Sequence, residues 1–206
     1  MKKNIAVFAS GTGSNFININ NKIKNNKINA KICLLVSNNS NSGAVKYCIK
    51  NNINFFIYND KRFSNDTNNK KIIEKMLNHN IDLVLLAGYM KKISKNFIDL
   101  FNNRIMNVHP SLLPLYGGKG FYGMKVHEKV FKNKEKETGA TIHFVDYHYD
   151  TGPILIQKKI KIEKNDTPIK ISEKVLKIEH EIYPMAVNFF CNDQILWKNN
   201  KPIIKE

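Results

Sequence analysis

The chain has few of the residues that hold small secreted folds together or that read nucleic acids. Its three cysteines, Cys33, Cys48 and Cys191, are far apart and form no Cys-x-x-Cys pair, which argues against a disulfide framework and a zinc site. No apolar run approaches the ~20 residues that a membrane span needs. We therefore expect a reducing, cytoplasmic location and no membrane partner.

Arginine is also scarce, although the formal net charge is +16. The only arginines are Arg62 and Arg104, and the lysines are scattered among Asn and Ile instead of forming one block. Recognition of bases and phosphates favours the arginine fork. We expect the charge to reflect a biased composition, with a partial role in attracting anionic small molecules, and we expect no nucleic-acid partner.

The basic start of the chain imitates a signal peptide. However, the apolar run in residues 1–9 stops after about five residues at Ser10-Gly11, which is too short for such a segment. The run is more typical of a first strand. With 206 residues, of which 42% are apolar, the sequence predicts one domain with one core.

The first half alternates apolar runs with helical patterns. Strands are expected at 4–9, 30–36, 53–58, 82–87 and 104–108, and helices at 15–24, 42–50, 68–80 and 94–101. Continuous apolarity, as at 83–87, is typical of parallel strands covered on both faces. The pattern predicts an α/β fold with a single doubly wound, mostly parallel, Rossmann-like sheet.

The second half has a different pattern. Two strands at 139–145 and 154–158, joined by a loop of about eight residues, predict an antiparallel addition to the sheet. A long helix at 169–190 and a small hairpin within 194–204 follow. No linker marks a boundary, so we expect one domain, 1–206, with halves of about 1–100 and 101–206.

A glycine loop, Gly11-Thr12-Gly13-Ser14-Asn15, falls between the first strand and the first helix, where backbone amides can hold an anion. It lacks the Gly-Lys-Ser/Thr of a Walker loop, and Phe16 replaces the third glycine of the dinucleotide fingerprint. The loop therefore favours a single phosphate. The alternative is a tight turn in which Ser14 or Asn15 caps the helix.

Asn107 and His109 lie two positions apart at the end of an apolar run, so on a strand both side chains point the same way. An amide and a protonated imidazole can donate hydrogen bonds to a developing oxyanion, and a carboxylate such as Asp150 can orient the imidazole. The alternatives are that Asn107 and His109 only cap the end of a strand, and that Asp150 is only a turn residue. The glycine loop and residues 87–90 are expected at the same edge of the sheet, which favours chemistry.

A metal site is not expected. His143, Asp146, His148 and Asp150 are close in sequence, but in an extended segment His143 would point to the opposite face from the other three. His127 begins a sequence like that of a zinc-protease helix, but Phe131 stands where the second histidine is required.

With these residues placed, the chain resembles the phosphoribosylglycinamide formyltransferases, also called glycinamide ribonucleotide transformylases, over nearly its whole length. Two motifs, 107–114 and 150–153, are shared across the formyltransferase superfamily. Two others, 10–15 and 179–184, narrow the resemblance to this family. The remaining motifs are 86–90 and 143–145.

The resemblance implies formyl transfer from 10-formyltetrahydrofolate, a cosubstrate, to the amine of 5'-phosphoribosylglycinamide in de novo purine biosynthesis, through a tetrahedral intermediate. It implies no bound cofactor, no metal, and small molecules as the partners of a monomer or homodimer. Asn107 and His109 would polarise the formyl oxygen. Asp150 would pair with His109 and relay a proton through water.

The resemblance also implies two binding sets. Gly13, Ser14 and Asn15 would hold the phosphate and Glu179 the ribose hydroxyls. The ribonucleotide set as a whole is Gly11, Thr12, Gly13, Ser14, Asn15, Met90, Pro110 and Glu179. The folate set is Met90, Lys91, Lys92, Ile93, Ile105, Asn107, Val145, Asp146 and Asp150.

Three positions depart from the family pattern. Lys91 stands where many relatives have arginine, so the folate glutamate tail would be held less rigidly. Leu176 replaces a basic or amide side chain, with Lys177 next to it, so the sequence does not identify the side chain that makes this phosphate contact. The segment 115–123 is longer than in some relatives, and its four glycines predict either a mobile flap or an ordinary flexible loop.

Three other functions share parts of this pattern. A methionyl-tRNA formyltransferase would need about a hundred further residues for nucleic-acid binding. A formyltetrahydrofolate deformylase would use the same three residues on water but usually has an amino-terminal regulatory domain, whereas here the pattern begins at Met1. A nucleotide-binding module without catalysis would not need the Asn107, His109 and Asp150 set.

Overall fold

The computed structural model describes residues 1–58 and 65–205, which form two compact units, Met1–Met106 and Asn107–Glu206. Arg62, one of the two arginines, lies outside the described residues. Seven strands form one sheet in the order β3-β2-β1-β4-β5-β6-β7. This confirms the expected α/β fold with a mostly parallel sheet and an antiparallel addition in the C-terminal half.

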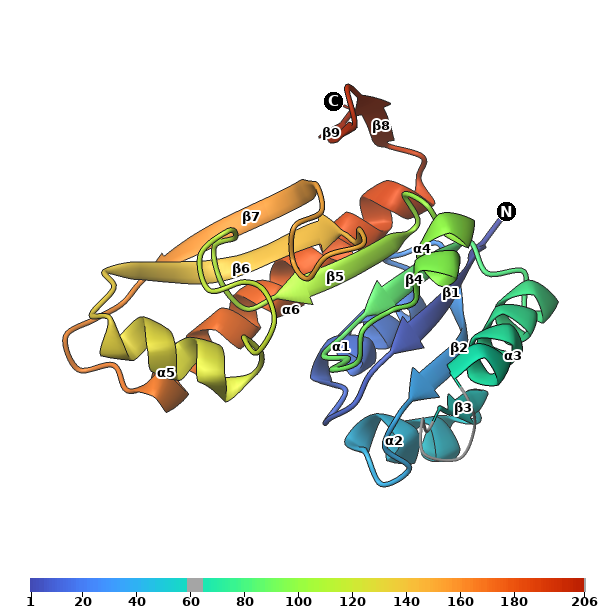
Figure 1. Ribbon diagram of the computed structural model, residues 1–206, viewed down its shortest axis with the longest axis horizontal. Helices are drawn as coiled ribbons and strands as arrows, with labels where there is room; N and C mark the ends of the chain where they lie inside the picture. Colours follow the sequence, from blue (N-terminus) through green and yellow to red (C-terminus); the bar gives the residue numbers. More distant parts are fainter. Residues whose placement is uncertain (59–64, 206) are drawn as a thin grey trace. The chain divides into compact units, whose positions relative to one another are not determined.

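The first unit is the alternating part of the chain (Figure 1). Its pairs β1–β2, β1–β4 and β2–β3 are all parallel. The strand order places the reversal of direction beside β1, where ligands gather in doubly wound sheets. The elements are β1 Lys3–Phe8, α1 Ser14–Lys24, β2 Ala30–Ser37, α2 Gly43–Asn51, β3 Phe55–Ile57, α3 Asn65–Asn78, β4 Leu83–Leu86 and α4 Lys95–Leu100.

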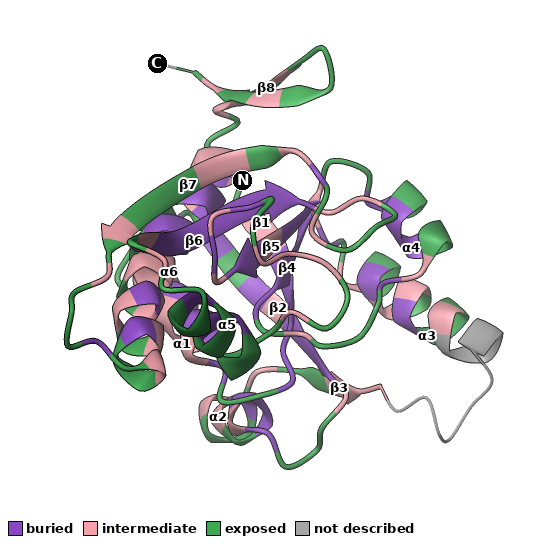
Figure 2. Cartoon of the chain, turned by 60° about the vertical axis from the view of Figure 1, so that its left-hand side comes forward, coloured by how far each residue is buried: buried purple, intermediate pink, exposed green. Residues whose placement is uncertain are grey.

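Burial explains why the central strands read as continuous apolar runs. All four residues of β4 and the last four of β1 are buried, as the purple strands of Figure 2 show. A strand covered on both faces has no solvent-facing positions to alternate with. β3 is shorter than the expected 53–58, and Phe55 is exposed.

The second unit contains the rest of the chain. β6 and β7 pair antiparallel, and the long helix α6 packs against both strands (Figure 1). β6 is buried almost throughout, whereas β7 is mostly exposed (Figure 2). The elements are β5 Ile105–His109, which begins at the end of the first unit, α5 Met124–Lys132, β6 Glu137–Phe144, β7 Ile154–Lys161, α6 Pro168–Cys191, β8 Ile195–Lys198 and β9 Lys201–Ile204.

The terminal hairpin of this unit was expected from the sequence, and its helix α5 was not. The terminal hairpin is confirmed as β8–β9, and the ring of Trp197 packs on that of Phe144 with centroids 4.8 Å apart. α5, however, was not expected: no element was predicted for its residues, which follow the glycine-rich segment 115–123. Within the part of the chain that the structure describes, no helix combines the length and apolar character needed to cross a membrane.

Candidate active site

Asn107 and His109 occupy the last part of β5. Being two residues apart on a strand, they extend toward the same face of the sheet. His109 is 3% exposed and Asn107 is half-buried. The strand therefore presents an amide and an imidazole side by side at its carboxyl end, as the spacing predicted.

Asp150 joins this pair from the loop after β6. The loop folds back tightly at Gly152, where a Cβ atom would lie 1.9 Å from the carbonyl oxygen of Phe144, so only glycine fits. Asp150 itself has φ +58°, in the left-handed region that Asp tolerates better than most residues. Its Oδ2 lies 3.5 Å from His109 Nδ1, and its Oδ1 lies 3.4 Å from Asn107 Nδ2.

His143 is a fourth member that reasoning from the sequence missed. Its Nε2 lies 3.0 Å from Asn107 Nδ2 and 3.7 Å from Asp150 Oδ1. The expectation that His143 points away from Asp150 is wrong, because β6 ends at Phe144 and the chain turns back instead of staying extended. The signal was available, since 143–145 is one of the motifs that carry the family resemblance.

The hydrogen-bond partners assign the protons of His143. Its Nδ1 lies 2.9 Å from the carbonyl oxygen of Phe144, which can only accept, so Nδ1 carries the proton and Nε2 accepts from Asn107. The second amide hydrogen of Asn107 has only the long 3.4 Å contact with Asp150. That hydrogen is the one available to an incoming ligand oxygen.

The backbone of the segment 115–118 holds the other side of the cluster. His109 Nε2 lies 2.8 Å from the carbonyl oxygen of Tyr116 and therefore donates to it. The amide of Gly118 donates to Asp150 Oδ2 at 2.9 Å. Gly117 between them has no room for a side chain, because a Cβ atom would lie 2.6 Å from Leu113 Cδ2.

Burial and charge shift the proton affinities of the cluster. Burial lowers the pKa of His109, and the Asp150 carboxylate and the Tyr116 carbonyl oppose this effect in part. Burial by itself raises the pKa of Asp150, but the charge of His109 and the Gly118 N–H bond hold it below its ordinary value. Asp150 is thus a carboxylate at neutral pH, next to an imidazole that gives up its proton readily.

The glycine loop follows β1 in the first unit. The N-cap of α1 is Gly13, with φ +78° and no side-chain hydrogen bond at the cap, so neither Ser14 nor Asn15 caps the helix as the alternative required. A Cβ atom at Gly13 would lie 2.8 Å from Ala44 Cβ at the start of α2. By contrast, Gly11 is exposed, with no atom within 4 Å of a Cβ atom placed there.

Ser10 connects the glycine loop to the segment after β4. Its amide donates to the carbonyl oxygen of Gly88 at 3.2 Å, and its hydroxyl accepts from the amide of Met90 at 3.2 Å. Two loops that follow adjacent parallel strands are thereby brought together within the first unit. They bring Met90 to the same edge as Gly11 and Gly13, as expected from the strand ends.

The other expected site residues differ in exposure. Met90, Lys91 and Lys92 are exposed, whereas Ile93 and Ile105 are buried. Pro110, Val145, Asp146 and Glu179 are half-buried, with Glu179 on α6. Asp146 closes its own loop by accepting from the His148 amide at 3.0 Å and the Thr151 hydroxyl at 2.8 Å.

The described residues contain no candidate metal site. Across residues 1–58 and 65–205, no group of three or more His, Cys, Asp or Glu side chains could hold a metal ion. His127 is buried on α5, and burial, with a smaller repulsion from His109, lowers its pKa to about 4.

Comparisons with known proteins agree on one family. Residues 3–187 match the family described as formyl transferase. The chain is 38% identical to a chloroplastic phosphoribosylglycinamide formyltransferase of Arabidopsis thaliana, over 97% of this chain and 69% of the relative. It is 35% identical to the Bacillus subtilis (strain 168) phosphoribosylglycinamide formyltransferase, over 97% of each chain.

Solved structures show the same similarity. Glycinamide ribonucleotide transformylase 1 from Symbiobacterium toebii has a TM-score of 0.92 at 26% identity, covering 100% of this chain and 95% of its own. A formyltetrahydrofolate deformylase from Pseudomonas syringae has a TM-score of 0.89 at 19% identity, with 100% of this chain and 67% of its own covered. At that identity the second likeness concerns the fold alone.

Proposed function

The chain belongs to the formyl transferase family, and from this we propose that it transfers a formyl group from 10-formyltetrahydrofolate to the amine of 5'-phosphoribosylglycinamide in purine biosynthesis. The observation that carries the proposal is the cluster of Asn107, His109 and Asp150, within one unit and with Asn107 and His109 each within 3.5 Å of Asp150. Relatives that are 35% to 38% identical are named for this reaction.

The chemistry assigned to the cluster follows from its geometry. The neutral amine attacks the formyl carbon, and the carbonyl oxygen becomes an oxyanion. It is stabilised by the Asn107 amide hydrogen that makes only the 3.4 Å contact with Asp150, and by the positive charge of protonated His109, whose Nε2 stays bonded to the Tyr116 carbonyl. The attacking nitrogen loses a proton, directly or through water, to the Asp150 carboxylate. Asp150 then returns this proton, directly or through water, to the folate nitrogen as the oxyanion collapses to a carbonyl and the carbon–nitrogen bond to the folate breaks. His143 holds the Asn107 amide in the orientation that this step needs.

The ribonucleotide is assigned to the glycine loop of the first unit. The identity of the N-cap residue of α1 supports this assignment, because Gly13 has no side chain of its own to cap the helix, and helix N-termini attract anions. Gly11, Thr12, Gly13, Ser14 and Asn15 would hold the phosphate, with Met90, Pro110 and Glu179 as further contacts. The narrow approach of Gly13 to Ala44 fixes the path of the loop.

The folate is assigned to a set with residues from both units. The set contains Met90, Lys91, Lys92, Ile93, Ile105, Asn107, Val145, Asp146 and Asp150. The exposure of Met90, Lys91 and Lys92 supports their contact with a ligand. We propose that the two units act as one formyltransferase domain, since the family match runs from residue 3 to residue 187. We also propose a reducing compartment for the chain, because Cys33, Cys48 and Cys191 are not joined in disulfides.

The deciding experiment follows the absorbance change as the formyl group leaves the folate, with and without the ribonucleotide. We expect turnover only when the ribonucleotide is present. Turnover on water alone would indicate a deformylase and would contradict the proposal. Protein carrying Asp150→Asn serves as the control for uncatalysed breakdown, because an amide cannot accept the proton.

A further inference from the structure

One short segment contacts both ionisable members of the catalytic cluster. The Tyr116 carbonyl oxygen accepts from His109 Nε2 at 2.8 Å, and the Gly118 amide donates to Asp150 Oδ2 at 2.9 Å. Both contacts are made by backbone atoms, two residues apart. Any displacement of this segment therefore changes the surroundings of His109 and Asp150 together.

The side chain of Tyr116 anchors this segment outside the cluster. Its hydroxyl donates to Glu135 Oε1 at 2.5 Å and accepts from Asn133 Nδ2 at 2.8 Å. Asn133 is the C-cap of α5, and Glu135 lies between α5 and β6. The Tyr116 ring also meets the edge of Phe121, with centroids 6.3 Å apart.

The backbone of Tyr116 needs such an anchor. Its φ of +56° lies in the left-handed region, which is unfavourable for an aromatic residue. Gly117, Gly118 and Gly120 follow it, so the chain after Tyr116 has little resistance of its own to bending. The hydroxyl contacts with Glu135 and Asn133 supply a restraint that the local sequence lacks.

We propose that Tyr116 is a positioning residue for formyl transfer, tying the 115–118 segment through its hydroxyl to Glu135 and Asn133 so that the segment's backbone holds His109 and Asp150. This inference rests on the proposed function of the same cluster. Tyr116 acts through the catalytic side chains and does not touch the reacting atoms.

The link from the Tyr116 hydroxyl to Glu135 and Asn133, called the tether below, also affects the pKa of His109. The carbonyl of Tyr116 favours the protonated form of His109, so a loosened segment lowers the pKa of His109 further. Three other ionisable side chains act on His109. They are Asp150 in the loop after β6, His143 on β6 and His127 on α5. Tyr116→Phe replaces none of them, although a displaced segment also weakens the bond from the Gly118 amide to Asp150.

The test is Tyr116→Phe, which keeps the ring and removes the hydroxyl. Both hydroxyl contacts are lost, and we expect kcat to fall about five- to tenfold, within the range of net hydrogen-bond contributions, with the KM for the ribonucleotide within about twofold of wild type. The pKa of His109, followed by NMR of histidine-labelled protein and assigned through His109→Asn, should move to lower pH. Unchanged kcat, or reduced kcat with an unmoved His109 titration, would overturn the proposal.

Substitutions at Glu135 test the same contact from the other side. Glu135→Gln keeps an acceptor for the hydroxyl and should leave kcat within about twofold of wild type. Glu135→Ala removes one of the two hydroxyl contacts that Tyr116→Phe removes, so it should lower kcat, but by no more than Tyr116→Phe does. The double variant should be no slower than Tyr116→Phe alone, because that substitution already removes the contact with Glu135. Additive losses, or equal damage from Gln and Ala, would contradict a hydrogen-bonded tether. Glu135→Ala also provides the test if Tyr116→Phe does not fold.

Tyr47→Phe is the matched control. Its hydroxyl likewise contacts two amide side chains, those of Asn20 and Asn21, but within the first unit. It should alter neither kcat nor the His109 titration. The NMR measurement needs no substrate. If the pKa of His109 moves as expected but the wild-type protein does not transfer formyl groups, the proposed function is refuted and the structural role of Tyr116 is still supported.

Discussion

In the proposed mechanism, formyl transfer depends most directly on the side-chain amide of Asn107. His143 fixes one of its two amide hydrogens, and the other is held only by a 3.4 Å contact. A donor that is already oriented loses little entropy when a transition state forms, which is why such donors contribute so much to catalysis. The proposed role of Asn107 thus depends on which of its two amide hydrogens is already bonded to His143 and which can bond to a ligand.

Removal of that amide gives the first prediction. Asn107→Ala should lower kcat by about two to three orders of magnitude, because one oxyanion donor contributes roughly 3 kcal/mol to transition-state stabilisation. Ribonucleotide affinity, measured by titration, should be nearly unchanged. Near-normal turnover would remove Asn107 from the mechanism, and a comparable loss of affinity would make it a binding residue.

The glycine loop gives the second prediction. Gly13 is a poor position to test, since any side chain there meets Ala44, whereas Gly11 has open space and an ordinary φ. Gly11→Asp should raise the KM for the ribonucleotide at least tenfold, or about 1.4 kcal/mol, by repulsion of the phosphate, and leave the folate KM unchanged. Gly11→Asn is the neutral control of equal size. Equal effects of Asp and Asn, or on both substrates, would count against the phosphate site.

His143 shows where the sequence was insufficient at the residue scale. Asn107, His109 and Asp150 could be predicted, because strand periodicity pairs the first two and the family motif supplies the third. The position of His143 depends on where β6 stops and on the close approach of Gly152 to Phe144. Neither is a local property, so an extended reading of the segment placed the side chain on the wrong face.

Among the elements, the long helices and buried strands followed their sequence signals closely. α6 begins at Pro168, after Thr167, whose side chain accepts from the Lys170 amide at 3.3 Å. α5 was missed because its stabilisation is tertiary: Val126, His127 and Val130 are buried, and the helix packs against α6. Nine residues are too few for intrinsic propensity alone to fix a helix.

The buried histidine of α5 gives a prediction for stability. Because the pKa of His127 falls from 6.5 to about 4 on folding, the unfolded chain takes up a proton there before the folded chain does. The free energy of unfolding is therefore not reduced by His127 above pH 6.5. It falls as the pH drops toward 4, by up to about 3 kcal/mol.

Denaturant unfolding from pH 7 to pH 4.5 measures this loss. His127→Leu should be less sensitive to acid than wild type, whatever its stability at pH 7, and the difference between the two slopes isolates His127 from Asp150 and His109. Parallel slopes would mean that His127 is protonated in the folded protein or exposed to solvent.

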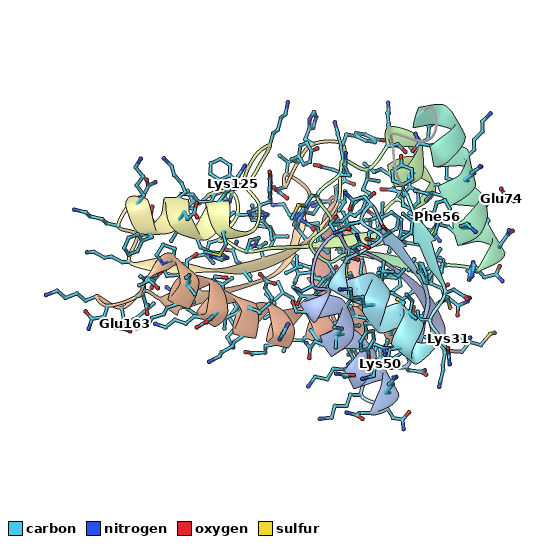
Figure 3. The ribbon with its side chains drawn as sticks, turned by 90° about the horizontal axis from the view of Figure 1, so that it is seen from below. Lys31, Lys50, Phe56, Glu74, Lys125 and Glu163 are labelled. Atoms are coloured by element: carbon cyan, nitrogen blue, oxygen red, sulfur yellow. The ribbon has the colours of Figure 1, made fainter. Side chains whose placement is uncertain are left out.

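For the whole molecule, the mostly parallel sheet and its antiparallel addition could be predicted, but the order of the strands and the role of the positive charge could not. Residues 1–106 hold 17 of the 33 Lys and Arg but only 5 of the 17 Asp and Glu. The excess of positive charge thus belongs mainly to the unit that carries the glycine loop. Lys31 on β2 and Lys50 on α2 are exposed, with their side chains on the outside of this unit (Figure 3).

This asymmetry predicts that salt slows the capture of anionic substrates. Raising the ionic strength from about 0.02 M to 0.2 M should lower kcat/KM for the ribonucleotide severalfold, since the Debye length shrinks to below about 10 Å. kcat should change much less, because screening acts on attraction and not on the bound state. The variant with Lys31→Gln and Lys50→Gln, both distant in sequence from the glycine loop, should flatten the dependence. If kcat/KM does not change with salt, the positive charge does not attract the substrate and reflects only a biased composition.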